Sequence, residues 1–516
     1  MLFSTLFFGQ TIHVPADFPS IQEAIDAANP NDTVLVDPGI YYEHIIVPDK
    51  ALVIGSLFLT TQDTDYIDQT IIDGSNNGRV IYIVGTDEFI TLSGFTIQNG
   101  NISGYSYGGG IFIQGGNNTT LTDLIVKSNT ATEGGGLGVL WYSSATIINT
   151  TFYNNQGIDD QVNYIEGCGG AVYARSAQLT FVNCHFDSNS ASLGGAIGEV
   201  DGNHAYHQCT FQSNNADLFG EAIVSFDTQK STFYDCEFTN HPIGTVFYPW
   251  GGNLTFNNCL IANNNIILSS HQYGDTITFL SSTIINNFGG EESIELSSGN
   301  LMYMFNTIFW NSGKINIKWN NTVYLSNTLL QNGMDGIEIE YTGNNVYSSG
   351  PVFDANPYFM DSLDYHLADW SPAIGAGADS VEMNGLWFYS PITDFDGNPR
   401  PSPSNTYPDL GAFENMLGLP VGIADRETDN KSDIKIFPNP ASTYCCIIFP
   451  IQFTEKAHHF TVCNINGKTV EERNISDHQN SIYLDVSDYP SGIYTVVYRA
   501  DDSNLNLGKF IVRHNQ

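Results

Sequence analysis

The chain has 516 residues, of which 41% are hydrophobic, so it can form more than one folded unit and is too apolar for a disordered protein. It carries 17 Lys and Arg against 55 Asp and Glu, a formal charge of -38, of which -35 falls in residues 1–419. Such a field repels phosphate backbones and anionic lipid, which excludes nucleic acid and acidic membranes as partners. Neutral sugars and calcium remain compatible with it.

The N-terminal 50 residues divide into two segments. Residues 1–10 are apolar and are interpreted as the remnant of a signal peptide, with a buried first strand as the alternative. Residues 11–50 are predicted to form an N-terminal cap and a first turn. Ser20 and Glu23 form a capping box, and an apolar stripe follows on the same short helix: Ile21, Ala24, Ile25 and Ala28. No later segment has the ~20 apolar residues of a transmembrane span.

An internal repeat of 21 to 34 residues dominates residues 51–350. Each copy has an aromatic residue, a small residue three positions later, an apolar residue after five and an Asn after eight. The aromatic positions are Phe181, Tyr206, Phe233, Phe256, Phe279, Tyr303 and Tyr324. The Asn positions are Asn189, Asn214, Asn264, Asn287, Asn311 and Asn332, with His241 in one copy.

The repeat has a direct structural meaning. Parallel strands lie ~4.8 Å apart, so one residue per turn stacks on its equivalent in the next turn. Two inward columns that are five residues apart require a corner between them, because inward positions on one strand repeat every two. The Asn column fits a ladder of side-chain amides at that corner. A glycine step such as Gly108 to Gly110 precedes a third strand. The expected fold is all-β, a right-handed parallel β-helix with three strands per turn.

The repeats resemble those of pectin-lyase-like β-helix proteins. Their alternating Phe-x-x-Asn and Gly-Gly-Ala-Ile motifs, over residues 95–335, also resemble chlamydial polymorphic membrane proteins, which are surface adhesins. The segment Ile21–Glu43 is similar to the entry segment of many pectin-lyase-like proteins. Residues 351–415, which include Asp394 to Arg400 and Asp409 to Glu414, resemble the terminal segment of bacterial surface β-helix proteins and are interpreted as the C-terminal cap.

Residues 416–433 are polar and are interpreted as a linker, followed by a different kind of domain. Residues 434–516 contain short alternating strands with Pro-Asn-Pro and Asn-Gly turns, which predict a small β-sandwich. Three motifs in order resemble the type A sorting domain of Bacteroidetes type IX secretion: Ile434 to Ala441, Thr461 to Val470 and Leu484 to Tyr494. The resemblance implies export by the type IX machinery to the medium or the outer-membrane surface. A carbohydrate-binding sandwich is the alternative.

Four of the eight cysteines occupy one repeat column: Cys184, Cys209, Cys236 and Cys259. Disulfides between neighbouring turns are compatible with the spacing. Thr150 and Ser282 occupy the same column, however, which favours small packed side chains and hence free thiols.

The candidate site lies beside the longest repeat, whose extra loop spans residues 157–166. A solenoid is nearly uniform, so a site is most plausible where one turn departs from the rest. The carboxylates of this loop can serve glycoside hydrolysis or bind calcium. Metal candidates are Asp159, Asp160 and Glu166. Catalytic candidates are these three with Arg175, Glu199 and Asp201; ligand-binding candidates are Arg175 and Tyr173, the latter expected to point outward. Lys314 and Lys318 are expected to pair with Glu338 and Glu340 across turns.

Three functions remain open at this point. The favoured one is a secreted or surface-bound monomer that binds glycan or another cell. The second is a polysaccharide lyase or glycoside hydrolase, although the sequence lacks the acidic triad with a Gly-His-Gly step of polygalacturonases. The third is a structural stalk. The repeats predict the fold and say little about the ligand.

Overall fold

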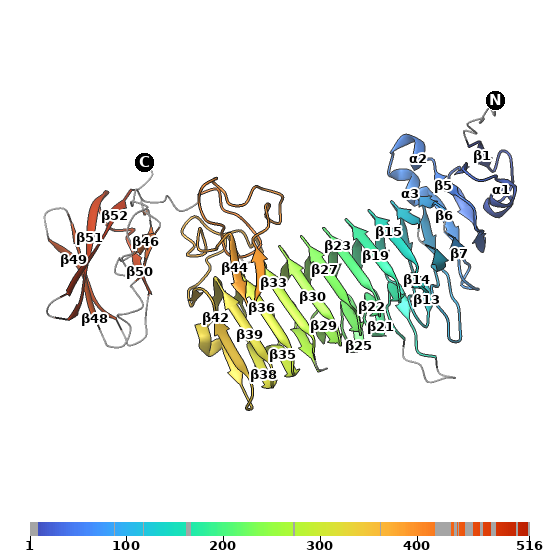
Figure 1. Ribbon diagram of the computed structural model, residues 1–516. Coiled ribbons are helices and arrows are strands. Elements are labelled where there is room, and N and C mark those ends of the chain that lie inside the picture. Colours follow the sequence, from blue (N-terminus) through green and yellow to red (C-terminus); the bar gives the residue numbers. More distant parts are fainter. Residues whose placement is uncertain are drawn as a thin grey trace, which may run out of the picture. The chain divides into compact units, whose positions relative to one another are not determined.

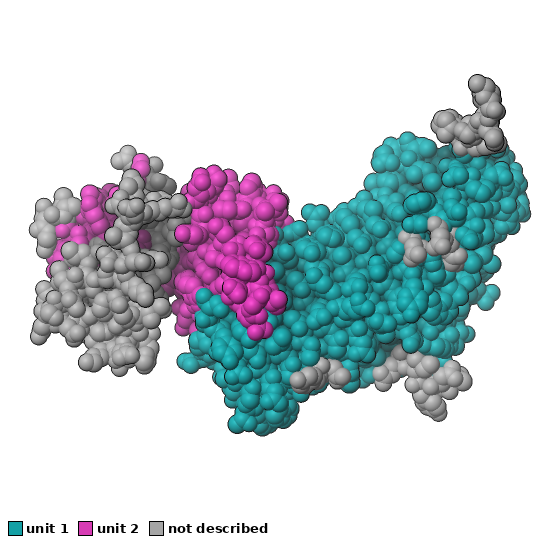
Figure 2. Space-filling view, viewed as in Figure 1, with its two compact units in different colours: residues 1–305, 311–325, 334–349 teal, residues 306–310, 326–333, 350–516 magenta. Residues whose placement is uncertain are grey.

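The computed structural model describes residues 9–86, 88–116, 118–160, 167–271, 274–361, 363–417, 435–437, 441, 443–448, 458–464, 468–475, 481–501 and 504–513. It divides into two compact units, coloured in Figure 2. Unit 1 comprises residues 1–305, 311–325 and 334–349; unit 2 comprises residues 306–310, 326–333 and 350–516. The predicted signal segment and the linker lie almost wholly outside the described residues.

The described repeats wind as a parallel β-solenoid in which each turn contributes one strand to each of three sheets (Figure 1). Sheets A, B and C contain 14, 13 and 12 strands within the described residues, so the solenoid has about 13 turns. The prediction of three strands per turn is confirmed. Sheet A consists of β1 (Thr11–Val14), β2 (Asp32–Val36), β5 (Leu52–Ser56), β8 (Ile90–Ser93), β11 (Thr119–Thr122), β15 (Ser144–Ile148), β19 (Gln178–Val182), β23 (Asn203–His207), β27 (Lys230–Tyr234), β30 (Asn253–Asn257), β33 (Thr276–Leu280), β36 (Leu301–Phe305), β39 (Thr322–Ser326) and β42 (Asn345–Ser348).

Sheets B and C complete each turn. Sheet B consists of β3 (Gly39–Tyr41), β6 (Thr70–Asp73), β9 (Thr96–Gln98), β12 (Ile125–Lys127), β16 (Thr151–Tyr153), β20 (His185–Asp187), β24 (Thr210–Gln212), β28 (Glu237–Thr239), β31 (Leu260–Ala262), β34 (Thr283–Ile285), β37 (Ile308–Trp310), β40 (Thr328–Leu330) and β43 (Val352–Phe353). Sheet C consists of β4 (Ile45–Val47), β7 (Ile81–Thr86), β10 (Ile111–Gly116), β14 (Leu137–Leu140), β18 (Val172–Arg175), β22 (Ile197–Val200), β26 (Ile223–Phe226), β29 (Thr245–Trp250), β32 (Ile266–Ser270), β35 (Glu292–Ser298), β38 (Lys314–Trp319) and β41 (Ile337–Ile339). A fourth short sheet follows sheet B in four turns: β13 (Thr130–Ala131), β17 (Gln156–Gly157), β21 (Ser190–Leu193) and β25 (Asn215–Phe219).

Stacked aromatic rings fill the interior behind sheet A. Phe181, Tyr206, Phe233, Phe256 and Phe279 are all fully buried, and the centroids of successive rings lie 5.0, 4.7, 4.9 and 5.0 Å apart. These separations match the strand spacing of a sheet, ~4.8 Å, so each ring packs on its equivalent one turn away. The core is therefore a direct product of the sequence period.

Tyr303 and Tyr324 do not belong to this column, and the prediction for them is wrong. Met304 pairs in register with Phe279, whereas Tyr303 pairs with Thr278. A shift of one residue moves a side chain to the opposite face of the strand. Tyr303 and Tyr324 stack on each other at 5.1 Å on that other face. The corner after β36 is one residue shorter than its equivalents, so a pattern of fixed spacing places Tyr303 instead of Met304 in the aromatic column.

An asparagine ladder runs along the corner that follows sheet B. Asn189 Oδ1 accepts hydrogen bonds from the backbone N–H and the side-chain amide of Asn155, both at 3.0 Å. Asn155 Nδ2 also donates to the carbonyl of Val126, and Asn155 Oδ1 accepts from the backbone N–H of Asn129, so the amide satisfies two buried backbone groups of the preceding turn. Further members are Asn129, Asn214, Asn264, Asn287 and Asn311.

The prediction that Asn332 belongs to this ladder is also wrong. It is exposed, has a φ of 67°, and donates its backbone N–H to Asp354 Oδ1 at 3.0 Å. In most turns the residue that precedes a ladder Asn has a left-handed φ, as Asn286 does at 53° before Asn287. Asn332 therefore matches the corner residue in conformation, because the same Asn side chain tolerates a left-handed backbone.

The sequence also holds a second ladder that the repeat pattern did not reveal, at the corner before sheet A. Asn300 Oδ1 accepts from the backbone N–H of Asp275, Asn321 Oδ1 from that of Asn300, and Asn344 Oδ1 from that of Asn321, at 2.9 to 3.0 Å. Each of these Asn residues lies four residues before an inward position of sheet A, as Asn300 does before Met304. This constant spacing is visible in the sequence and could have revealed the ladder.

The predicted N-terminal cap is present as α1 (Ile21–Ala27). Ser20 Oγ accepts from the backbone N–H of Glu23 at 3.2 Å, and Ile21, Ala24 and Ile25 are buried. The carboxylate of Glu43 accepts from the N–H groups of Ile21 and Gln22, while Lys50 Nζ donates to carbonyls at the other end of the helix. The negative charge of Glu43 lies at the N-terminus of the helix and the positive charge of Lys50 at its C-terminus, and both positions are stabilised by the helix dipole. The remaining helices of the described residues are α2 (Phe58–Thr61), α3 (Asp65–Gln69) and the 3-10 turn Gly333–Gly336.

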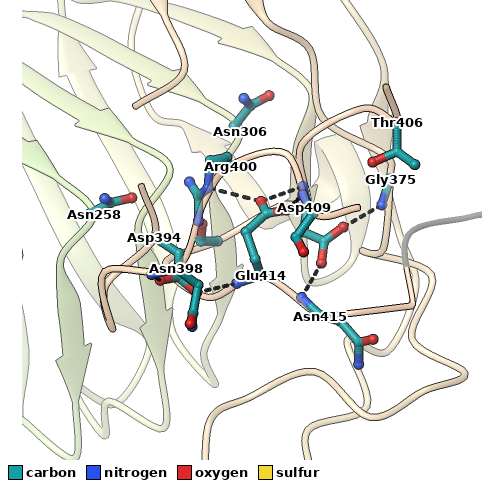
Figure 3. Close-up of polar contacts among 12 residues, drawn as sticks. Asn258, Asn306, Gly375, Asp394, Asn398, Arg400, Thr406, Asp409, Glu414 and Asn415 are labelled. Carbon is teal, nitrogen blue, oxygen red and sulfur yellow. Dashed lines mark hydrogen bonds and ion pairs between the residues drawn. The ribbon is translucent and has the colours of Figure 1, made fainter. Parts of the chain in front are cut away.

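Within unit 2, residues 350–417 surround a buried charge cluster (Figure 3). Arg400 Nε lies 2.9 Å from Glu414 Oε1, and both side chains are fully buried. Asp409 accepts from the backbone N–H groups of Gly375 and Asn415 at 2.6 Å. Burial and the neighbouring Glu414 raise the pKa of Asp409 well above its usual range. This cluster joins segments far apart in the sequence and has a structural role. A hairpin of β44 (Ser380–Met383) and β45 (Leu386–Tyr389) belongs to the same region.

The C-terminal tail contains two antiparallel sheets. One has the order β46 (Lys435–Phe437), β47 (Tyr444–Ile448), β50 (Ser481–Asp485); the other has β49 (Thr469–Ile475), β48 (His458–Asn464), β51 (Gly492–Asp501), β52 (Asn504–Val512). Buried residues of both sheets form one cluster, with Ile447, Leu484, Val462, Val496 and Phe510 among its members. Across the described residues, no helix is long and apolar enough to cross a membrane.

All eight cysteines are free thiols. Cys184, Cys209, Cys236 and Cys259 are fully buried, and Cys236 Sγ donates to the carbonyl of Tyr206 one turn away. Burial raises the pKa of the Cys236 thiol well above its usual range, which makes the thiol unreactive.

Candidate functional site

An aromatic cluster covers the outer face of sheet C in the early turns. Its outward positions alternate between large residues and glycine in register: Phe112 pairs with Gly138, Gly138 with Tyr173, and Tyr173 with Gly198. A Cβ on Gly198 would lie 2.3 Å from Cys168 Sγ, so any larger residue there would displace the Cys168 side chain. The space above each glycine is occupied by the side chain of the residue that directly precedes a glycine step. These residues pair with one another in successive turns, in the order Tyr107, Glu133, Cys168 and Leu193.

Among the described residues, Glu133 is the one carboxylate inside this otherwise apolar cluster. Its exposed fraction is 7%, and burial raises its pKa to about 7, against the opposing effects of Tyr173, Arg175 and Tyr105. Among the described residues, Glu133 Oε2 has no hydrogen-bond partner. A carboxyl group with this pKa exchanges its proton near neutrality, so it can donate or accept a hydrogen bond from a ligand.

Two arginines flank the cluster. The Arg79 guanidinium lies 4.5 Å from the centroid of Phe112 and donates to the carbonyls of Tyr107 and Gly108. Arg175 is exposed at the end of β18 and acts electrostatically on Glu133, Tyr107 and Tyr173. These are two of the eight basic residues in residues 1–419, so the cluster interrupts a strongly acidic surface.

The predicted ligand-binding residues Tyr173 and Arg175 both belong to this face. Tyr173 points away from the solenoid interior, as expected, but its exposed fraction is only 4%. It is covered by Tyr107, Glu133 and Cys168, which come from three successive turns. Burial and the Glu133 carboxylate raise the pKa of the Tyr173 phenol. Its ring is therefore a wall of the cluster and not a free stacking surface. Tyr105 and Trp141 supply exposed rings, with exposed fractions of 43% and 50%.

The predicted loop carboxylates have other partners. Asp159 Oδ1 accepts from the backbone N–H of Gly167 at 2.8 Å and from Ser192 Oγ at 2.6 Å, and these bonds lower its pKa. Asp159 thus closes the base of the loop. Asp160 is buried at 3% exposure. Glu166 lies outside the described residues. No group of three His, Cys, Asp or Glu residues in the described part of the chain is arranged to hold a metal ion.

Glu199 points into the solenoid, so the expectation that it lies beside the loop is wrong. It is fully buried and accepts hydrogen bonds from the hydroxyls of Tyr206, Ser225 and Ser231 at 2.5, 2.9 and 2.6 Å. Its neighbour two residues earlier, Ile197, is an inward residue, so the period of two already indicated this orientation.

Asp201 lies at an exposed corner with a φ of 50° and accepts from Ser176 Oγ at 3.3 Å. The fold therefore separates Asp201 from Glu199, although the two are close in sequence. Of the predicted residues, only Tyr173 and Arg175 belong to the Glu133 cluster.

Sequence reasoning missed Glu133, Tyr105 and Tyr107. The signal was the residue directly before each glycine step, where Tyr107, Cys168, Leu193 and Phe219 are apolar or aromatic and Glu133 alone is charged. A single carboxylate in an apolar column is a buried ionisable group and hence a candidate site.

Two family models match the chain. Residues 55–259 and 161–303 match the right handed beta helix region, and residues 435–513 match the secretion system C-terminal sorting domain. The chain is a right-handed β-helix protein with a type IX sorting tail. It is exported through type IX secretion to the cell surface or the extracellular space. The predictions of fold and of export are confirmed to this extent.

No curated protein matches this β-helix protein. Three solved structures resemble it at low identity. Geobacillus virus E2 ORF18 has 13% identity and a TM-score of 0.35 over 90% of this chain and 72% of that chain. The gp42 tailspike of Acinetobacter phage vb_AbaP_AS12 has 9% and 0.35 over 96% and 78%. DFA-IIIase from Arthrobacter chlorophenolicus A6 without its lid has 11% and 0.31 over 69% and 92%. Likenesses at this level carry no information on activity.

Proposed function

We propose that this exported β-helix protein binds an extracellular glycan on the outer face of sheet C, around Glu133, Tyr105 and Arg175. The observation that carries the proposal is the buried Glu133 carboxyl, which has a pKa of about 7 and an Oε2 with no hydrogen-bond partner among the described residues. Ligand sites in proteins are mostly apolar with a few converging polar groups, and this cluster has that composition. Exposed Tyr105 and Trp141 add rings suited to a sugar face.

A polysaccharide panel tests this function. The purified protein should bind at least one neutral or acidic polysaccharide, and Tyr105→Ala and Arg175→Ala should each weaken binding by about tenfold, the effect of losing ~1.4 kcal/mol. Tyr407→Ala, at a tyrosine of unit 2 with 59% exposure, is the matched control. Binding that is equal in parent and variants, or no binding to any member of the panel, contradicts the proposal.

The second candidate is cleavage of the bound glycan. The specific support is again Glu133, since a general acid works best when its pKa lies near the working pH. Glu133→Gln should then abolish product release and retain binding. Product release that is unaffected by Glu133→Gln excludes this role.

Calcium at Asp159, Asp160 and Glu166 stays a prediction. Chelation should lower the melting temperature or glycan affinity of the parent, and Asp159→Ala with Glu166→Ala should remove that response. An unchanged melting temperature and affinity after chelation contradict calcium binding there.

We also propose boundaries for the segments of the chain. We infer a signal segment at 1–10, a cap at 11–50, repeats at 51–350, a second cap at 351–415, a linker at 416–433 and a sorting sandwich at 434–516. The shared core of the two C-terminal sheets supports the sandwich. The protein is proposed to act as a monomer and as an adhesin at the cell surface, and the sorting tail is compatible with that location.

A further inference from the structure

A second polar cluster occupies the outer face of sheet C, on β32, β35 and β38. Register places Ser269 opposite Glu295, and it places Ser270 opposite Leu296 and Leu296 opposite Ile317. The next residue along each strand is therefore His271, Ser297 and Lys318. Five polar side chains thus come from three successive turns.

The cluster contains a complete hydrogen-bonded relay. His271 Nε2 lies 2.7 Å from Ser269 Oγ, and His271 Nδ1 lies 3.2 Å from Ser297 Oγ. Ser297 Oγ donates to Glu295 Oε1 at 2.9 Å. Because Ser297 gives its only proton to the carboxylate, it accepts from Nδ1–H, which leaves Nε2 to accept the proton of Ser269. The network therefore selects the tautomer in which His271 acts as a base toward Ser269.

Glu295 is held in its charged form. Burial alone would raise its pKa, but the hydrogen bonds from Lys318 and Ser297 outweigh burial and lower it. Lys318 Nζ lies 2.5 Å from Glu295 Oε1, so this lysine pairs with Glu295 and not with the expected Glu340, whereas Lys314 pairs with Glu338 at 3.3 Å as predicted. The second oxygen of this carboxylate, Oε2, lies 3.9 Å from His271 Nε2.

We propose that Ser269 and His271 form a nucleophile–base pair that hydrolyses small acyl esters. A base within hydrogen-bond reach of the nucleophile and oriented by a third group is the requirement for an activated serine. Ser269 has an exposed fraction of 6% and His271 side chain one of 43%, so only a small acyl group such as acetyl can reach Ser269 Oγ. The Tyr248 ring, 5.7 Å from the His271 ring, forms one wall. The substrate class is an acetylated alcohol, for example an acetylated sugar.

The reaction balances with water alone. Ser269 Oγ forms a bond to the ester carbonyl carbon while its proton passes to His271 Nε2. The bond from the carbonyl carbon to the alcohol oxygen breaks, and His271 returns the proton to the leaving alcohol. Water then attacks the acyl-serine with His271 as base, which releases the carboxylic acid and restores Ser269.

The proposal does not depend on the Glu133 cluster. In this reaction Ser297 and Glu295 are positioning residues, since they act through His271. A purely structural network on this face would have the same hydrogen bonds, so the discriminating property is reactivity of Ser269 itself.

The test uses the full chain, p-nitrophenyl acetate and a fluorophosphonate probe. The parent should hydrolyse the ester and become labelled at Ser269, as located by peptide mass spectrometry. Ser269→Ala and His271→Ala should each lower kcat by at least about 100-fold, the usual range for loss of such a group. Ser297→Ala should lower kcat with little change in KM.

Two controls keep the result interpretable. His207→Ala, at a histidine that stacks on Tyr234 on sheet A, and Ser188→Ala should leave hydrolysis unchanged. A circular dichroism melt identifies any variant that fails to fold, and probe labelling of the parent provides a result independent of variants. Absence of labelling at Ser269 together with parent hydrolysis equal to that of Ser269→Ala overturns the proposal.

Discussion

His241 Nδ1 lies 2.9 Å from Asn264 Oδ1, which places an imidazole in the interior ladder of amides. Asn264 Oδ1 also accepts from the backbone N–H of His241 at 3.1 Å, so Nδ1 must be the protonated nitrogen. Nε2 then faces Asn214 Nδ2 at 3.4 Å as an acceptor. The neutral imidazole therefore replaces a ladder amide both as a hydrogen-bond donor to one neighbouring turn and as an acceptor from the other.

This arrangement predicts a loss of stability in acid. Burial lowers the pKa of His241 to about 4, whereas the unfolded chain retains the ordinary value of 6.5. The unfolded state consequently binds the proton first, and stability falls as the pH drops from 6.5 to 4, by about 3 kcal/mol in total. His241→Asn should remove this part of the pH dependence in urea titrations at pH 4, 5.5 and 7. An identical pH dependence in parent and variant would show that His241 is not responsible.

Glu133 should have the opposite pH dependence. Its folded pKa of about 7 exceeds the unfolded value of 4.5, so the folded state binds more protons and stability falls as the pH rises from 4.5 to 7. Glu133→Gln, which mimics the protonated acid, should stabilise the protein by up to about 3 kcal/mol at pH 8 and have little effect at pH 4.5. Denaturant midpoints at both pH values measure the difference. A gain that is equal at pH 4.5 and pH 8 contradicts the assigned titration.

Phe256 tests the stacked core. Phe256→Ala removes a fully buried ring that contacts Phe233 and Phe279 in the adjacent turns, and it should cost ~3–5 kcal/mol through the cavity. Phe288→Ala, at a phenylalanine with 66% exposure, is the matched control and should cost less than ~1 kcal/mol. The melting temperatures of the two variants provide the comparison, and similar values would contradict the stacked interior.

Arg400 tests the buried cluster of unit 2. Arg400→Met leaves Glu414 buried without its cation, and loss of one partner of such a pair costs about 3–5 kcal/mol. Limited proteolysis should then cut within residues 350–417 faster than in the parent. Replacing Arg400 and Glu414 together by Met and Gln should restore part of the loss, because position 414 then no longer holds a buried carboxylate without its cation. If the single variant is as resistant as the parent, the ion pair has no stabilising role.

The sorting tail makes a prediction about location. Because residues 435–513 match the sorting domain and have a core of their own, deletion of 434–516 should leave the solenoid folded and retained in the periplasm. Immunoblots of periplasm and medium measure the distribution, with the full chain as control. Export of the truncated protein at the parent level contradicts the assignment.

The solenoid could be predicted in detail because its turns repeat. Every inward residue meets its own equivalent one turn away, so the Phe181 column and the Asn189 ladder are visible as a sequence period. The prediction went wrong where the period slips by one residue. The short corner before Ile308 left the Asn311 phase intact and changed the face of Tyr303, and only strand register distinguishes these alternatives.

The site could not be predicted in the same way. The sequence by itself determined the stacked columns, the corners and the exported tail, since each follows from local spacing or a local motif. Tertiary structure alone decided the chemistry. Glu133 acquires its raised pKa because the adjacent turns bury it, and His271 becomes a base because Ser297 and Glu295 lie on the next turn. Burial and hydrogen bonding between turns depend on distances in space, and these distances cannot be read from the sequence of a single turn.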